Sequence, residues 1–131
     1  MKKHLRWGLC VALLLAGCQP LSLDKEKDLD PGDSTYYFLD PPKYAQTVKV
    51  EVKSPEPVAA AILKGDNEES ALKALSDFAK GQKDAILAEK LGKGDKEYTI
   101  EASVPANTAY TVYIRNSGTK PAKVHVKIQG R

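Results

Sequence analysis

Cysteine, histidine and clustered carboxylates are the side chains of this sequence that could take part in chemistry, and they are few. The 131 residues include two cysteines, Cys10 and Cys18, and two histidines, His4 and His125. Cys10 lies inside an apolar run, whereas Cys18 lies just after this run and is preceded by Leu15-Ala16-Gly17. A cysteine thiolate is a nucleophile that can be alkylated. Cys18 is therefore the first candidate for covalent modification.

The first seventeen residues have the organisation of an export signal. Lys2, Lys3 and Arg6 are basic, no acidic residue is present, and the apolar run covers residues 7–16. This run is shorter than the roughly 20 apolar residues that a transmembrane helix needs. It fits the hydrophobic region of a signal peptide, which has about 7–15 residues. We therefore expect residues 1–17 to be a cleaved signal peptide.

The sequence Leu15-Ala16-Gly17-Cys18 resembles the lipobox of bacterial lipoproteins at all four positions. The resemblance implies that signal peptidase recognises Leu15, Ala16 and Gly17 and cleaves before Cys18. It also implies that the Cys18 thiol receives a diacylglyceryl group and that the new amino group is acylated, for example with palmitate. Two or more acyl chains give stable membrane anchoring. Gln19 follows the cysteine, and in enterobacterial lipoproteins a residue other than Asp there favours the periplasmic face of the outer membrane over the inner membrane.

Loss of the signal changes the composition of the remaining 114 residues. The twenty basic residues fall to seventeen, which equals the number of acidic residues, so the mature domain is formally neutral. This balance argues against a nucleic-acid partner, which would require a basic patch. With Cys10 removed and Cys18 lipidated, no disulfide can form. One histidine, His125, remains, and we expect it to face solvent on a strand, so the sequence predicts no catalytic residues and no enzyme.

Asp24, Asp28, Asp30 and Asp33 form an acidic cluster around Gly32. Calcium binds six to eight oxygens from closely spaced carboxylates and carbonyls. The spacing departs from the EF-hand loop because it lacks a third alternating ligand and a bidentate glutamate, and two lysines between the aspartates offset their charge. We expect a solvated segment without a metal site or a cofactor other than the lipid. Asp28, Asp30 and Asp33 are kept as candidates for weak calcium binding.

The remaining chain divides into a tether and a domain. Residues 18–33 are highly charged and predict a lipidated N-terminus followed by a tether. From residue 34 onward, apolar residues alternate with polar ones in segments 48–52, 98–104, 110–115 and 124–129, which predicts half-buried strands. Residues 36–38 and the apolar run 58–63 predict two more strands, the latter separated from 48–52 by Pro55 and Pro57.

A single helix interrupts this pattern of strands. Residues 66–80 have apolar residues at helical spacing (Leu72, Leu75 and Phe78), and Gly81 is a helix stop. We expect this stripe to cover one end of the domain; binding of a partner is the alternative. Residues 85–91 fit a strand or a helical extension, and 92–95 predict a turn. The fold class is therefore mainly β: an antiparallel, jelly-roll-like β-sandwich of about seven strands at residues 34–131 with one inserted helix.

Two motifs resemble those of bacterial pre-peptidase C-terminal domains. Residues 32–38 (GDSTYYF) resemble the opening G-D-x-x-Y-Y-x-F, although Phe38 directly follows the tyrosine pair, and Val104-Pro105-Ala106 before residues 110–114 resembles a corner near the end. The resemblance covers residues 30–130, with the helix as a departure. It implies a sandwich that acts as an accessory binding or secretion-associated module without catalytic residues. Some members bind calcium near their start.

These observations predict a lipid-anchored protein of the bacterial cell envelope. We expect its sandwich to be a non-catalytic interaction or structural module; the alternative is an accessory domain that binds calcium or carbohydrate. The expected partners are the membrane, through the lipid, and an envelope protein or glycan. Tyr98 and Tyr110 are predicted on the core faces of their strands, and Tyr113 on an outward face, so one exposed ring offers little platform for a sugar.

Overall fold

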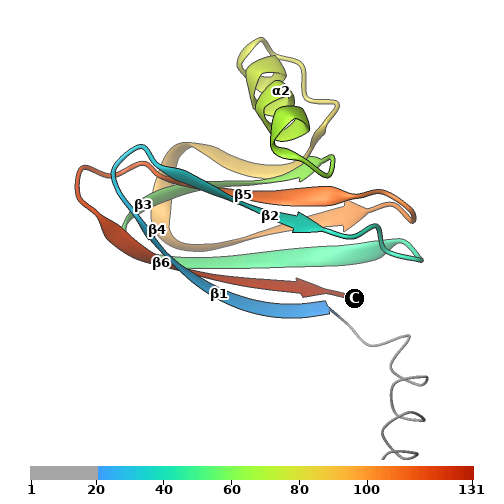
Figure 1. The fold of residues 1–131 in the computed structure, drawn as a ribbon, viewed down its shortest axis with the longest axis horizontal. Helices are drawn as coiled ribbons and strands as arrows, with labels where there is room; N and C mark the ends of the chain where they lie inside the picture. The colour runs from blue at the N-terminus through green and yellow to red at the C-terminus, as the bar shows by residue number, and fades with distance from the viewer. Residues whose placement is uncertain (1–20) are drawn as a thin grey trace, which may run out of the picture.

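The computed structural model describes residues 21–131, apart from the side chain of Lys93, so the predicted signal peptide and Cys18 lie outside the described residues (Figure 1). None of the helices among these residues has both the length and the apolar character to span a membrane. The elements are β1 (Leu21–Leu29), β2 (Ser34–Leu39), β3 (Gln46–Lys64), α2 (Glu68–Ala79), β4 (Ile86–Val104), β5 (Tyr110–Asn116) and β6 (Ala122–Gly130). All strand pairs are antiparallel. The predicted fold class, a mainly β antiparallel sandwich with one helix, is confirmed.

The long strands β3 and β4 pair with each other and run through both layers of the sandwich. Along its other edge, β3 pairs with β6 over residues 48–53 and with β5 over residues 58–64. The first half-sheet therefore has the order β1, β6, β3 and β4, using residues 46–53 and 97–104 of the long strands. The second half-sheet has the order β2, β5, β3 and β4, using residues 58–64 and 86–95. The two half-sheets lie one above the other in Figure 1.

The bend between the half-sheets corrects two sequence predictions. Pro55 and Pro57 lie within β3 instead of ending a strand, because β3 changes partner there and its register with β4 shifts between Lys53 and Val58. Residues 92–95, predicted as a turn, lie within β4 at this irregularity, and 86–91 form a strand. Gly94 has a φ of 70°, and a Cβ there would lie 2.6 Å from the carbonyl oxygen of Val58. The glycine thus allows the two bent strands to stay in contact.

Strand β1 corrects the predicted tether. Residues 21–29 pair over their whole length with β6, from Leu21 opposite Gly130 to Leu29 opposite Ala122. Leu29 is buried, and Leu21 and Leu23 pack against the core. The charged residues between them are exposed because β1 is at the edge of the sheet. Charged residues thus hid the alternation of this strand in the sequence, and residues 21–29, predicted as part of a tether, belong to the folded domain.

The main core lies between the half-sheets. As predicted, Tyr98 and Tyr110 face this core. Its fully buried large side chains come from both layers: Val48, Val50, Val52, Val104, Val124 and Ile128 from the first half-sheet, and Val58, Ile62, Tyr110, Val112 and Ile114 from the second.

Helix α2 covers the outer face of the second half-sheet, not one end of the sandwich (Figure 1). Ala71 and Ala74 pack against Leu63 and Tyr113, whereas Leu72, part of the predicted apolar stripe, is 51% exposed. The small side chains of Ala71 and Ala74 let the helix lie close to the sheet. The sequence prediction considered the large apolar residues of the helix and therefore missed the face that these alanines form. Tyr113 faces outward as predicted, but the helix layer buries it.

Candidate functional site

The residues predicted for lipidation, Leu15, Ala16, Gly17 and Cys18, lie outside the described residues, so their roles remain predictions. The calcium candidates do lie within them. Asp28 is exposed on β1, and Asp30 and Asp33 lie in the turn to β2, where the Asp33 amide donates to the Asp30 carbonyl at 2.9 Å. Within residues 21–131 no three His, Cys, Asp or Glu side chains are grouped so that they could hold a metal ion.

His125 lies on the outer face of the first half-sheet, as predicted. Its Nε2 is 3.1 Å from the Oε1 of Glu26 on β1, and both side chains are half exposed. In register, the next residues across the sheet are Lys53 on β3 and Glu97 on β4, whose side chains are 3.8 Å apart. The four side chains form a row across four strands. Exposed ion pairs of this kind contribute at most about 1 kcal/mol to stability, so the row is a charged surface that adds little to the stability of the fold.

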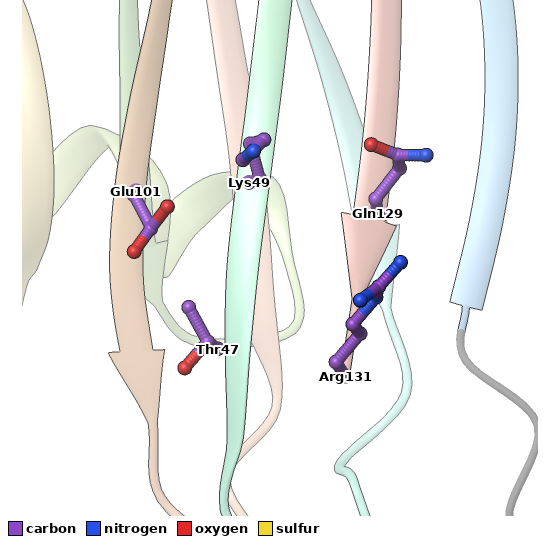
Figure 2. A pocket seen from close by; sticks show the side chains of 5 residues that line it. All are labelled: Thr47, Lys49, Glu101, Gln129 and Arg131. Carbon is purple, nitrogen blue, oxygen red and sulfur yellow. The ribbon is translucent and has the colours of Figure 1, made fainter.

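The rest of this outer face is also polar, and it has a hollow near the beginning of β3 and the end of β6. Figure 2 shows side chains projecting from β4, β3 and β6 around a shallow hollow of about 270 Å³. Sequence alternation predicts that three of its residues, Lys49, Glu101 and Gln129, face outward, but only the strand order places all five residues together. They are Thr47, Lys49, Glu101, Gln129 and Arg131.

Strand β2 forms a second surface with different chemistry. It pairs with β5 along one edge, and no described strand pairs with its other edge. The amide of Asn116 on β5 donates to the carbonyl of Asp33 at 3.0 Å. The backbone groups of successive residues in an antiparallel strand point alternately to its two sides. This bond therefore shows which residues of β2 direct their backbone groups toward β5 and which direct them away from it. The residues whose backbone N–H and C=O point away from β5 are Ser34, Tyr36 and Phe38.

The side chains of the same three residues lie on the outer face, beside the layer of α2. Tyr36 packs into the cluster under the helix, whereas Tyr37 faces the main core. The rings of Tyr36 and Phe38 are stacked with centroids 6.0 Å apart, and Phe38 is 48% exposed. We call Ser34, Tyr36 and Phe38, with their outward backbone groups, the β2 surface.

The three edge strands differ in how they resist unwanted pairing. Charged residues on an edge discourage the addition of another strand. Strand β1 (LSLDKEKDL) has five charged residues, and β4 (ILAEKLGKGDKEYTIEASV) has seven. Strand β2 (STYYFL) has none, and it has no proline or glycine. Among the described edges, β2 is thus the one open to a partner strand.

Burial controls the ionisation of the tyrosines around both layers. Burial, with smaller contributions from Tyr113 and Glu68, raises the pKa of Tyr36. Burial raises the pKa of Tyr110 to about 12. The pKa of Tyr98 is also raised by burial and, secondarily, by the charge of Asp95. All three therefore stay neutral at physiological pH and act as packing groups or hydrogen-bond donors, not as bases.

Comparisons with known proteins agree with this geometry at the level of the fold. No family model matches the chain, and no curated protein is similar to it in sequence. The structure of Aeromonas hydrophila PliG, a periplasmic lysozyme inhibitor of g-type lysozyme, superposes with a TM-score of 0.59 at 12% identity, covering 87% of this chain and 90% of that chain. The Yersinia pseudotuberculosis-derived mitogen superposes with a TM-score of 0.52 at 8% identity, covering 83% and 85%. At such low identities the likeness shows the shared sandwich fold alone.

Proposed function

We propose that this protein is a lipoprotein of the bacterial envelope whose sandwich binds another protein without catalysing a reaction. The lipid is attached to Cys18, and the partner contributes an extended segment to the β2 surface. The support for the anchor is the match of residues 15–18 to the lipobox. The support for a protein partner is the free, uncharged edge of β2.

The β2 edge is the observation that carries the binding proposal. A partner strand added there gains main-chain hydrogen bonds to Ser34, Tyr36 and Phe38, and its side chains alternate between the two faces. Those on the outer face meet the stacked rings of Tyr36 and Phe38. Aromatic residues are enriched and charged residues depleted at the centres of protein interfaces. The charged face of the first half-sheet offers neither feature, so we assign it to solvation.

The contact can be tested in cells by placing a photo-reactive phenylalanine analogue at position 38 of the full chain. The matched control places it at Thr99, which is exposed on another edge strand of the sandwich, β4. We expect one covalent adduct at position 38 and none at position 99. The substitution Phe38→Lys should abolish co-purification of that partner, and Thr99→Lys should not. Equal adducts at both positions would contradict binding at β2.

The membrane anchor is tested separately with Cys18→Ala. This protein should lose labelling by fatty acid and retain its signal peptide, because the thiol must be modified before cleavage. Labelling that persists in Cys18→Ala would refute the lipobox assignment without affecting the β2 experiment.

The PliG likeness suggests one specific partner to try first. PliG inhibits g-type lysozyme according to its name, and we therefore include a g-type lysozyme among the candidate partners. Inhibition that is lost with Phe38→Lys but not with Thr99→Lys would identify the partner. Without inhibition, the partner is the protein recovered in the crosslinking experiment. Recovery of glycan instead of protein would favour the alternative of a carbohydrate-binding module.

A further inference from the structure

We propose that the end of the sandwich at which β1 begins rests on the lipid headgroups, with the ring of Tyr44 at the membrane interface. This orientation builds on the proposed lipid at Cys18. It adds a second contact with the membrane, made by the folded domain itself.

The short link between Cys18 and β1 is the first step of the argument. Strand β1 begins at Leu21, three residues after Cys18. Consecutive Cα atoms are 3.8 Å apart, so the Cα of Leu21 lies within about 11 Å of that of Cys18. A cysteine whose acyl chains are in the bilayer is itself at headgroup level. The start of β1 must therefore lie at the membrane surface, whereas a tether through residue 33 would have allowed a separation several times greater.

The strand pairing shows which residues share this end. Leu21 is opposite Gly130, and the backbones of Arg131 and Thr47 exchange two hydrogen bonds of 2.8 and 3.0 Å. The amide of Asn107 donates to the carbonyl of Pro42 at 2.7 Å, which joins the loop 40–45 to the corner 105–109. Figure 1 shows both connections and the C-terminus at the same end as the start of β1. We call residues 40–45, 105–109 and 131 the anchor end.

The anchor end has the chemistry of a membrane interface. Tyr44 is 68% exposed, more than Phe38 or Leu72, the other exposed large hydrophobic residues of the described chain. Tyrosine is enriched at membrane–water interfaces because its ring is apolar and its hydroxyl polar. The Nζ of Lys43 lies 5.9 Å from the centroid of this ring. Lys43 and Arg131 add two positive charges, and Asp40 is the one acid within residues 40–45, 105–109 and 131. The amide of Gly65 donates to the carbonyl of Ala109 at 3.0 Å, so the connection from β3 to α2, with Asp66, lies at the same end.

The opposite end lacks these features. It comprises the connections 30–33 and 117–121 and the bends of β3 and β4 at 54–57 and 92–95. None of these segments contains an aromatic residue, and together they have four acids (Asp30, Asp33, Glu56 and Asp95) and two lysines (Lys93 and Lys120). An anionic leaflet attracts basic residues, and Lys43 and Arg131 present two of them beside the ring of Tyr44. In this orientation the strands rise from the membrane, and the β2 surface remains accessible from the side.

Tryptophan fluorescence can test the orientation, since Trp7 is the one tryptophan of the sequence and leaves with the signal peptide. Tyr44→Trp then gives a single reporter at the anchor end, and Thr119→Trp, at an exposed position, gives the matched control at the other end. Strand β6 has nine residues, and at ~3.3 Å per residue it separates the two ends by roughly 30 Å. The mature lipoproteins, expressed from the full chain, are reconstituted in phosphatidylethanolamine–phosphatidylglycerol vesicles with phospholipid brominated near the glycerol end.

We expect Tyr44→Trp to show a blue-shifted emission that brominated lipid quenches, and Thr119→Trp to show neither effect. Adding Lys43→Glu should reduce the quenching at position 44, whereas Lys120→Glu should leave it unchanged. Equal quenching at both positions, quenching at 119 alone, or no quenching at either position would overturn the orientation. The mass of the intact protein separates the two proposals: lipidated protein without a response at position 44 refutes the orientation alone, whereas protein without lipid refutes the anchor.

Discussion

Asn116, at the end of β5, makes three hydrogen bonds that tie β1 to the rest of the sandwich. Its side chain is fully buried. The Nδ2 donates to the carbonyl oxygens of Leu29 at 3.0 Å and Lys120 at 2.9 Å, and the Oδ1 accepts from the amide of Gly118 at 2.9 Å. One amide thus joins the end of β1, the end of β5 and the turn before β6.

Replacing Asn116 with Ala removes all three bonds and leaves two carbonyls and one N–H without this partner. A hydrogen bond contributes about 1 kcal/mol net, and a buried group left unsatisfied costs about 1–3 kcal/mol. We therefore expect Asn116→Ala to lower the free energy of unfolding by about 3 kcal/mol or more. Asn116→Asp keeps the acceptor but sets a negative oxygen against two carbonyls, so it should be at least as destabilising at neutral pH.

The assay is urea unfolding of the purified protein followed by circular dichroism. Thr111→Val is the matched control, because Thr111 is also fully buried and its hydroxyl makes a single hydrogen bond, to the carbonyl of Gly65 at 2.9 Å. That variant should lose about 1 kcal/mol. If Asn116→Ala is no more destabilising than Thr111→Val, the reasoning from three shared bonds is wrong. Such a result would also weaken the assignment of β1 to the folded domain.

Three further results are expected. Gly94→Ala should lower the thermal midpoint, because a Cβ at a φ of 70° would lie 2.6 Å from the carbonyl oxygen of Val58; an unchanged midpoint would contradict the close approach of β3 and β4. The protein should lose stability as the pH rises above about 10, since burial raises the pKa of Tyr98 and its hydroxyl donates to Val58 at 2.6 Å. Because the pKa of Tyr98 is higher in the folded than in the unfolded protein, its contribution to stability is complete below the unfolded pKa and is lost as the pH rises above it. Tyr98→Phe should be less stable at pH 7, but its melting temperature should fall less between pH 7 and alkaline pH. Millimolar calcium should leave the thermal midpoint unchanged, and a rise that disappears in the double substitution Asp28→Ala and Asp30→Ala would instead support the calcium alternative.

The strands with strict alternation were predictable because burial of one face imposes a period of two on the sequence. Residues 110–115 and 124–129 form β5 and β6 as predicted, and Val48, Val50 and Val52 face the core. The helix was predictable for a similar reason. Its Asn67 cap accepts from the amide of Ser70 at 2.8 Å, and Gly81 follows its end with a φ of 87°.

The errors occur where local signals compete with pairing to distant residues. The charges of β1 predict a tether, but Leu21, Leu23 and Leu29 reach the core once β6 supplies a partner. Pro55 normally ends a strand, but it is tolerated where β3 exchanges β6 for β5. Such exchanges depend on residues more than forty positions away along the chain, and no local pattern reports them.

The candidate surfaces divide in the same way. The sequence by itself determined the alternating faces of most strands, and it predicts the export signal, the lipid on Cys18 and the neutral charge of the remaining domain. All of these follow from residue types and short spacings. Only the tertiary structure decided that β2 is an uncharged free edge, that Tyr44 shares an end with the start of β1, and that α2 covers one layer through its alanines. Those properties depend on strand order and on contacts between distant segments, which follow from the packing of the whole core.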